Sequence, residues 1–82
     1  MLIYKTSDGI YQIDNKILPV GSCGLEIYGT QITIRSMVTR IAYVDMVDIT
    51  TIDSATNGTK YTTVASFLTA MKGFFNPSLD VV

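Results

Sequence analysis

The sequence predicts a mainly β (α+β) fold: a small antiparallel sheet, sandwich or barrel of about five to six strands, with one short C-terminal α-helix. Three kinds of observation lead to this prediction. Short apolar runs recur along residues 1–53, and in several of them apolar and polar residues alternate. Gly, Asn, Asp and Pro separate many of these runs, as in chains that turn between strands. Near the C-terminus the apolar spacing becomes helical.

The first two runs, Leu2–Lys5 and Ile10–Asp14, predict a β-hairpin. Asp-Gly lies between them, and Gly9 accepts the positive φ that a tight hairpin turn requires. A third strand is expected at Ile17–Val20. Pro19 cannot donate a hydrogen bond to a sheet, so we expect this strand at an edge or as a short piece.

A second hairpin is predicted by Leu25–Tyr28 and Gln31–Arg35, which are joined near Gly29 and Thr30. The loop Gly21–Gly24 leads into it. In the second strand isoleucines alternate with polar residues, which is typical of a strand with one buried and one solvated face.

The stretch Met37–Ile52 is rich in β-branched residues and almost free of turn residues, so it predicts extended chain. Asp45 interrupts the alternation of this stretch, and a bulge or break near Asp45 reconciles its two registers. A helix at Val38–Met46 is the alternative, because some of its residues also fit helical spacing.

The segment 63–72 predicts the helix. Its apolar residues recur at the spacing of one helical face, at positions Val64, Phe67, Leu68 and Met71. Thr63 is a favourable N-cap, Lys72 suits the negative end of the helix dipole, and Gly73 can adopt the left-handed conformation of a C-cap. A helix this short must dock on the sheet to be stable.

The composition describes one domain, residues 1–82, with little charge. Six basic and seven acidic residues give a formal net charge of −1, and 48% of the residues are hydrophobic. The basic residues are scattered, whereas binding to nucleic acid requires them on one face, so we expect no nucleic-acid partner. The sequence shows neither a membrane span nor a signal peptide, so we expect no membrane partner. The apolar excess instead indicates a surface that other protein chains cover.

Candidates for catalysis are few. The chain has no histidine, and its single cysteine, Cys23, has no neighbouring cation that would activate it. Asp45, Asp48 and Asp53 are the nearest approach to a carboxylate cluster, but their spacing matches no metal-binding loop. We therefore expect no enzyme, no metal site and no cofactor, and leave open whether the three aspartates bind an ion.

The apolar tail, residues 74–82, is the candidate interface. Its anchors are predicted to be Phe74, Phe75, Leu79, Val81 and Val82. The alternative is that one phenylalanine ring packs under the helix while the other covers the edge of the sheet. If the tail serves assembly, neighbouring copies exchange it or pair through open strand edges.

The segment Ile52–Asn76 resembles a pattern found in small structural proteins of tailed bacteriophages, particularly crAss-like phages and other phages of Bacteroidetes. The matching residues are Asp53, Gly58, Thr59, Tyr61, Thr63, Val64, Phe67, Leu68, Gly73, Phe74 and Phe75. The resemblance implies a virion component, such as a head decoration or head-fibre base protein, or a tail or connector element. It identifies a packing unit and no chemistry.

Two functions follow as hypotheses. The first is a non-enzymatic virion structural protein, assembled in the cytoplasm of the host bacterium, that contacts copies of itself and other virion proteins. The alternative is a small phage-encoded intracellular module that binds or regulates a host protein.

Overall fold

A computed structural model describes residues 1–7 and 10–76 of the chain. Its elements are β1 (Ile3–Ser7), β2 (Ile10–Ile13), β3 (Lys16–Pro19), β4 (Cys23–Tyr28), β5 (Gln31–Ser36), β6 (Ala42–Asp48), the 3₁₀ helix η1 (Ile49–Thr51) and α1 (Val64–Ala70). The strands form two three-stranded antiparallel sheets, ordered β1-β2-β3 and β4-β5-β6. The predicted fold class is therefore confirmed: mainly β, with one short helix after the strands.

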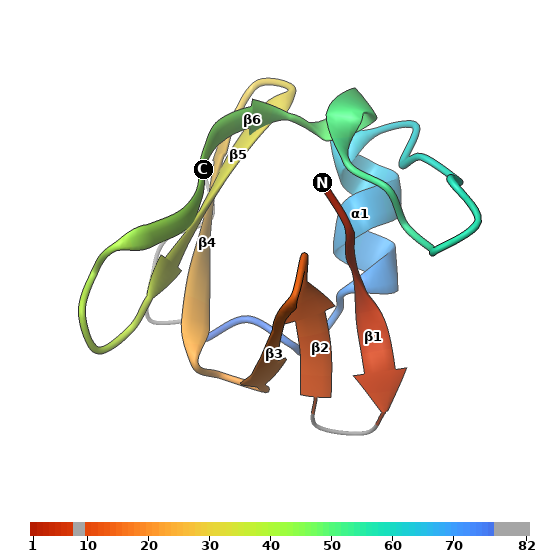
Figure 1. The fold of residues 1–82 in the computed structure, drawn as a ribbon. Coiled ribbons are helices and arrows are strands. Elements are labelled where there is room, and N and C mark those ends of the chain that lie inside the picture. Colours follow the sequence, from red (N-terminus) through yellow and green to blue (C-terminus); the bar gives the residue numbers. More distant parts are fainter. Residues whose placement is uncertain (8–9, 77–82) are drawn as a thin grey trace.

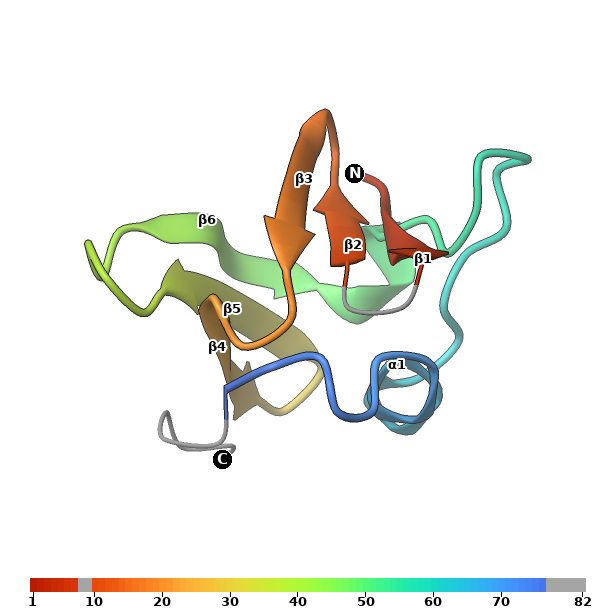
Figure 2. The same cartoon turned by 90° about the horizontal axis from the view of Figure 1, so that it is seen from below.

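The two sheets and the helix surround one hydrophobic core. Figure 1 shows β4, β5 and β6 on one side of the molecule and β1, β2 and β3 on the other. In Figure 2 the two sheets are set at a steep angle to each other, and α1 lies across from β6. The buried residues come from all three parts: Ile3, Ile13, Cys23, Leu25, Ile27, Ile32, Ile34, Val44, Ile49, Ile52, Tyr61, Phe67, Met71 and Phe74.

Two-residue turns explain two of the strand pairs. Asp14 has a φ of 51° and joins β2 to β3, where Ile13 pairs with Lys16. Gly29 has a φ of 65° and joins β4 to β5 at the predicted position. Positive φ values match the right-handed twist of a hairpin, which is why such turns favour Gly, Asn and Asp. The predicted Asp8-Gly9 turn lies outside the described residues.

β6 is shorter than the extended stretch predicted for Met37–Ile52. The break near Asp45 is confirmed: Met46 has a φ of 53°, and the pairing of β5 with β6 shifts register there. The Met46 N–H donates instead to the Thr33 hydroxyl at 3.1 Å, so the bulge is satisfied by a side chain. The prediction of extended chain over Met37–Ile52 is wrong at both ends, because a turn precedes β6 and η1 follows it. The alternative helix at Val38–Met46 does not form.

Side chains supply the bonds that end β6 and begin α1. The Asp48 carboxylate accepts from the Thr50 N–H at 2.9 Å and caps η1. At α1, the Thr63 hydroxyl accepts from the Ser66 N–H at 3.0 Å, and the Ser66 hydroxyl accepts from the Thr63 N–H at 3.2 Å. This reciprocal capping box confirms Thr63 as the N-cap. Leu68, predicted on the buried face, is partly exposed.

The segment after η1 closes the outer edge of β1. The Ile3 N–H donates to the Asp53 carbonyl at 2.9 Å, and the buried Tyr61 hydroxyl donates to the Ile3 carbonyl at 2.7 Å. The Asp53 carboxylate in turn pairs with the Lys60 ammonium. Residues nearly sixty positions apart in sequence are thereby joined, so this contact links the first strand to the C-terminal half.

The carboxyl groups of Asp53 and Asp48 predict that the fold loses stability in acid. The hydrogen bond from Lys60 lowers the pKa of Asp53, and hydrogen bonds from Thr50 lower the pKa of Asp48. A folded-state pKa below the unfolded value of about 3.9 means that the stabilisation is present above that pH and is lost as the pH falls through the folded pKa. We therefore expect the urea midpoint to fall as the pH drops from about 6 to about 3.

Asp53→Asn tests which carboxylate is responsible. The variant is expected to unfold at lower urea than the native chain at pH 6, and to lose less of its midpoint on acidification. Asp45→Asn, at an exposed position of β6, removes the same charge and serves as the control. If the urea midpoint fell equally with pH in the native chain and in Asp53→Asn, the role assigned to the Asp53–Lys60 pair would be contradicted.

Candidate interaction surface

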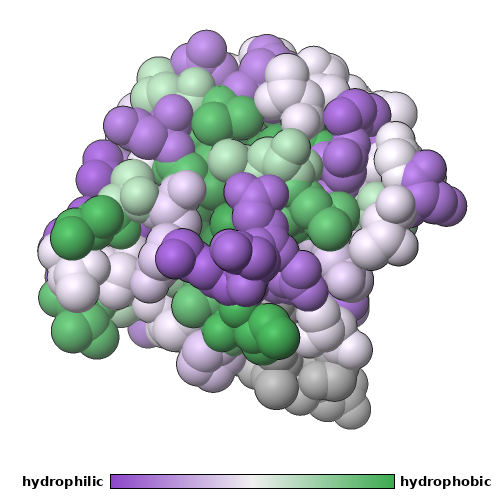
Figure 3. Space-filling view, in the orientation of Figure 1, coloured by the Kyte–Doolittle hydropathy of each residue, from purple (hydrophilic) through white to green (hydrophobic). Residues whose placement is uncertain are grey.

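The turn between β5 and β6 presents two large apolar side chains to solvent. Val38 is 90% exposed and Ile41 is 68% exposed. Figure 3 shows apolar side chains gathered on this turn, at the left of the view. Single exposed apolar residues are ordinary on protein surfaces, whereas neighbouring ones on one projecting turn are a feature of contact sites.

Hydrogen bonds hold this turn in one conformation. The Ser36 hydroxyl accepts from the N–H groups of Val38 and Thr39, each at 3.2 Å. Arg40 takes a φ of 64° and donates its N–H to the Ser36 carbonyl at 3.0 Å, and the Ser36 N–H donates to the Ile41 carbonyl at 3.0 Å. The turn is therefore preorganised, which reduces the entropy that a contact through Val38 would cost.

The connection between β3 and β4 adjoins this turn. The Met37 N–H donates to the Ser22 carbonyl at 2.9 Å, and the Ser22 N–H donates to the Pro19 carbonyl at 3.2 Å. Val20 lies within this connection and is exposed, and Ile17 of β3 is 65% exposed. Apolar side chains also lie over β3 in Figure 3. The four residues Ile17, Val20, Val38 and Ile41 are called the apolar surface below.

Polar and charged residues lie close to the apolar surface in the fold. Arg35 pairs with Glu26 at 3.2 Å and also donates to the carbonyl of Arg40 at 3.4 Å. The Tyr28 hydroxyl donates to Glu26 at 3.2 Å, and the negative charge of Glu26 raises the pKa of Tyr28. On the other side, the Lys16 ammonium lies 5.8 Å from the centre of the Tyr43 ring. An apolar centre with a polar rim is the usual composition of a protein interface.

Strand edges beside the apolar surface offer little for pairing. Since Ile13 and Lys16 close the two-residue turn, the outward-facing residues of β3 are Ile17 and Pro19. Pro19 has no N–H, and its carbonyl already accepts from Ser22. The bulge at Met46 interrupts β6. Proline and bulges both protect edges, so contact here depends on side chains more than on strand pairing.

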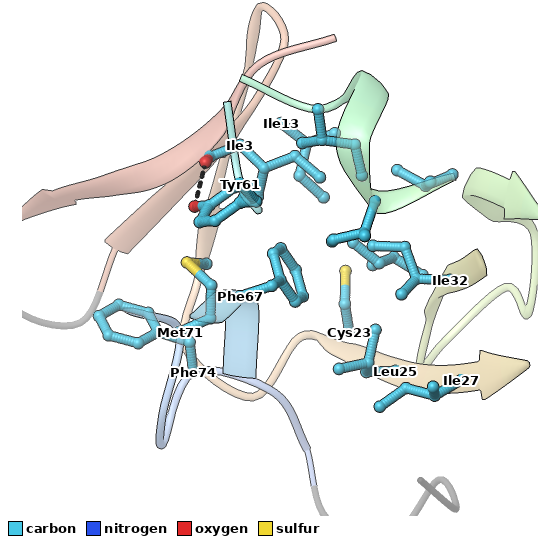
Figure 4. Packing of buried hydrophobic residues seen from close by; sticks show 14 residues of the cluster. Ile3, Ile13, Cys23, Leu25, Ile27, Ile32, Tyr61, Phe67, Met71 and Phe74 are labelled. Atoms are coloured by element: carbon cyan, nitrogen blue, oxygen red, sulfur yellow. Dashed lines mark hydrogen bonds between the residues drawn. The ribbon is translucent and has the colours of Figure 1, made fainter. Parts of the chain in front are cut away.

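The predicted anchors of the tail are placed differently from the expectation. Phe74 is 8% exposed and packs in the chain's own core, where Lys5 lies 5.1 Å from its ring centre. Phe75 is partly buried, with its ring centre 5.9 Å from that of Phe67. Figure 4 shows Phe74 beside Met71. Phe74 thus lies in the core of its own chain, and its role as an interface anchor stays a prediction.

The remaining predicted anchors, Leu79, Val81 and Val82, lie outside the described residues. Both rings turn inward because the chain reverses after α1: Gly73 adopts a φ of 82°, and Phe74 donates its N–H to the Met71 carbonyl at 3.1 Å. This reversal returns Phe74 and Phe75 to the core instead of extending them as one strand. The alternative in which the rings serve their own fold fits the described positions of Phe74 and Phe75.

The aspartates and the cysteine considered for catalysis or ion binding make contacts within the fold. Asp48 caps η1 and also accepts from the Thr30 hydroxyl at 3.0 Å, while Asp53 pairs with Lys60. Cys23 is fully buried in the core. Within residues 1–7 and 10–76, no three metal-binding side chains gather in one place.

Comparisons with known proteins returned no match: no family model, no curated protein and no solved structure is similar to the chain. Over the described residues, none of the helices has the length and apolar character needed to cross a membrane.

Proposed function

We propose that the chain is a non-enzymatic structural protein of a tailed-phage particle and that it acts through contacts between subunits. The observation that carries the proposal is the apolar surface, in particular the exposed and hydrogen-bonded turn that bears Val38 and Ile41. The resemblance of residues 52–76 to small virion proteins supports the particle as the setting. The partner that we assign to the apolar surface is a second copy of the chain.

The magnitudes fit a contact that forms only in an assembly. Burying one Val or Ile side chain contributes about 1.5–3 kcal/mol, so two from each copy contribute on the order of 6–12 kcal/mol. Association costs about 4–15 kcal/mol in lost translational and rotational freedom. The two terms nearly balance, and a particle with many copies adds further contacts. Losing Val38 and Ile41 should therefore abolish the association.

Sedimentation of the full chain tests this proposal. The native chain is expected to associate with rising concentration, and the double variant Val38→Asp/Ile41→Asp to remain a monomer with an unchanged circular dichroism spectrum. Leu68→Asp places one such charge on the exposed side of α1 and serves as the control, which should still associate; each single variant, Val38→Asp and Ile41→Asp, matches it in charge.

A native chain that stays monomeric at all concentrations would contradict self-association. If that monomer captured one bacterial protein through Val38 and Ile41, the alternative function as a host-binding module would replace the proposed one. Association that persists in the double variant would place the contact elsewhere on the chain.

A further inference from the structure

The loop between η1 and α1 presents an Asn-Gly pair to solvent. Figure 1 shows this loop projecting at the right of the view. Asn57 and Gly58 are both exposed. Gly58 has a φ of 84°, and a Cβ at this position would have no atom within 4 Å other than those of its chain neighbours. Water and dissolved base therefore reach the main chain of the pair.

An asparagine followed by glycine can modify its own side chain. The main-chain nitrogen of Gly58 attacks the Cγ atom of Asn57, a new N–Cγ bond forms, and the amide proton passes to a base in solution. The Cγ–Nδ2 bond breaks, and the leaving nitrogen takes up a proton and departs as ammonia. Water then opens the resulting succinimide ring at either carbonyl, which yields aspartate or isoaspartate. Glycine favours the attack because it has no Cβ that blocks the approach.

The closed turn engages both reacting groups. The Gly58 N–H donates to the Ala55 carbonyl at 3.2 Å, so the proton that must leave is held in a hydrogen bond. The Asn57 Oδ1 atom accepts from the Thr59 N–H at 3.2 Å and from the Thr59 hydroxyl at 2.7 Å. Because these bonds must break before the nitrogen of Gly58 can reach Cγ, the closed turn slows the reaction.

The loop can open without disturbing the core. The Ser54 hydroxyl donates to the Thr59 carbonyl at 3.0 Å, and the pair of Asp53 with Lys60 closes the base of the loop. The nearest core residues, Ile52 and Tyr61, lie just outside it. Loops that are held by exposed hydrogen bonds open with much less free energy than global unfolding requires. Opening of residues 54–59 is therefore a local event in the folded chain.

We propose that Asn57–Gly58 is a site at which the chain modifies itself: Asn57 becomes aspartate or isoaspartate through a succinimide with Gly58, and the closed turn restrains the reaction. Both products add a negative charge to the loop. Isoaspartate also lengthens the main chain, because the former side-chain carbon becomes part of it. The path between Asp53 and Lys60 then no longer fits the turn, which weakens the contact of Asp53 with Ile3 of β1.

Mass spectrometry of peptides from the full chain, aged in a mildly alkaline buffer, tests the site. The mass change from amide to acid is expected at Asn57, and isoaspartate should be detected there by enzymatic methylation. Two asparagines serve as internal controls: the side chain of Lys16 hinders attack at Asn15, and Pro77 after Asn76 has no N–H. An unmodified Asn57, or modification no faster than at Asn15, would overturn the proposal.

Two threonine variants test the restraint by the turn. Thr59→Val removes the hydroxyl that donates to Asn57 and should speed the modification by about threefold to tenfold, the effect of losing one hydrogen bond. Thr56→Val, at an exposed position of the same loop, removes a hydroxyl that makes no hydrogen bond within the described residues and should leave the rate unchanged. Equal rates in the two variants, or slower modification of Thr59→Val, would contradict the restraint.

Urea unfolding of aged chains tests the consequence for the fold. The aged native chain should have a lower urea midpoint than the fresh chain. Asn57→Gln is the matched control, because its longer side chain would have to form a larger ring and reacts far more slowly; its midpoint should not change on ageing. A midpoint that stays constant in the modified native chain would contradict the weakened contact with β1. This inference does not rest on the proposed function, and none of these results depends on association through Val38 and Ile41.

Discussion

Phe67→Ala is expected to remove a large part of the stability of the fold. Phe67 is fully buried at the centre of the core, with its ring centre 5.1 Å from that of Tyr61 in an edge-on arrangement and 5.9 Å from that of Phe75. Replacing a buried Phe by Ala costs about 3–5 kcal/mol, because apolar burial is lost and a cavity remains. A small domain has only about 5–15 kcal/mol in total.

Urea unfolding followed by circular dichroism measures the effect of Phe67→Ala. Leu68→Ala, one residue further along α1 and partly exposed, is the control and should cost well under about 1.5 kcal/mol. Similar losses for the two variants would mean that α1 does not dock through Phe67. The comparison therefore tests the orientation of the helix as well as the core.

Phe74→Ala is expected to destabilise the isolated chain by about 3 kcal/mol, because the ring is buried among residues of the core. A ring that anchored a neighbouring chain would behave differently: its loss would weaken association and leave the monomer as stable as before. The same variant thus separates the structural position of Phe74 from the role that the sequence suggests for it.

The measurement for Phe74→Ala is the urea midpoint at a concentration where the native chain is monomeric. Lys72→Ala, at an exposed position two residues earlier, is the control and should change the midpoint little. An unchanged midpoint for Phe74→Ala, together with lost association, would support Phe74 as an interface anchor.

The elements that the sequence predicts correctly are those with local signals. Thr63 and Ser66 determine the start of α1 through their own side chains, and Gly29 marks the turn of the second hairpin. The bulge is also visible in the sequence, because Asp45 disturbs the alternation of β6 and Met46 then adopts a positive φ. In each case the interaction that determines the structure lies within a few residues in sequence.

The turn that carries Val38 and Ile41 has no such signal. Residues 37–41 contain no Gly, Pro, Asn or Asp, and the bonds that stabilise the turn come from the Ser36 hydroxyl and from Ser22 in another connection. Arg40 adopts a positive φ that its residue type does not indicate. The pattern of β-branched residues therefore favours extended chain, and the exposure of Val38 appears only in three dimensions.

The position of Phe74 and Phe75 was equally hidden. The sequence places two rings side by side after Gly73, but their directions depend on the reversal of the chain and on where the core lies. Exposure of an apolar residue is a property of the whole fold, so composition indicates an excess of apolar surface without locating it. The structure locates exposed apolar residues on the turn between β5 and β6 and places both rings against the core.

The most direct test of the account is to follow the methyl NMR signals of the full chain over a dilution series. If subunits meet through the apolar surface, the signals of Val38 and Ile41 shift with concentration, whereas those of Leu68 on α1 stay constant. Signals of Val38 and Ile41 that do not change with concentration, or shifts confined to α1, would contradict the claim that this surface joins the subunits.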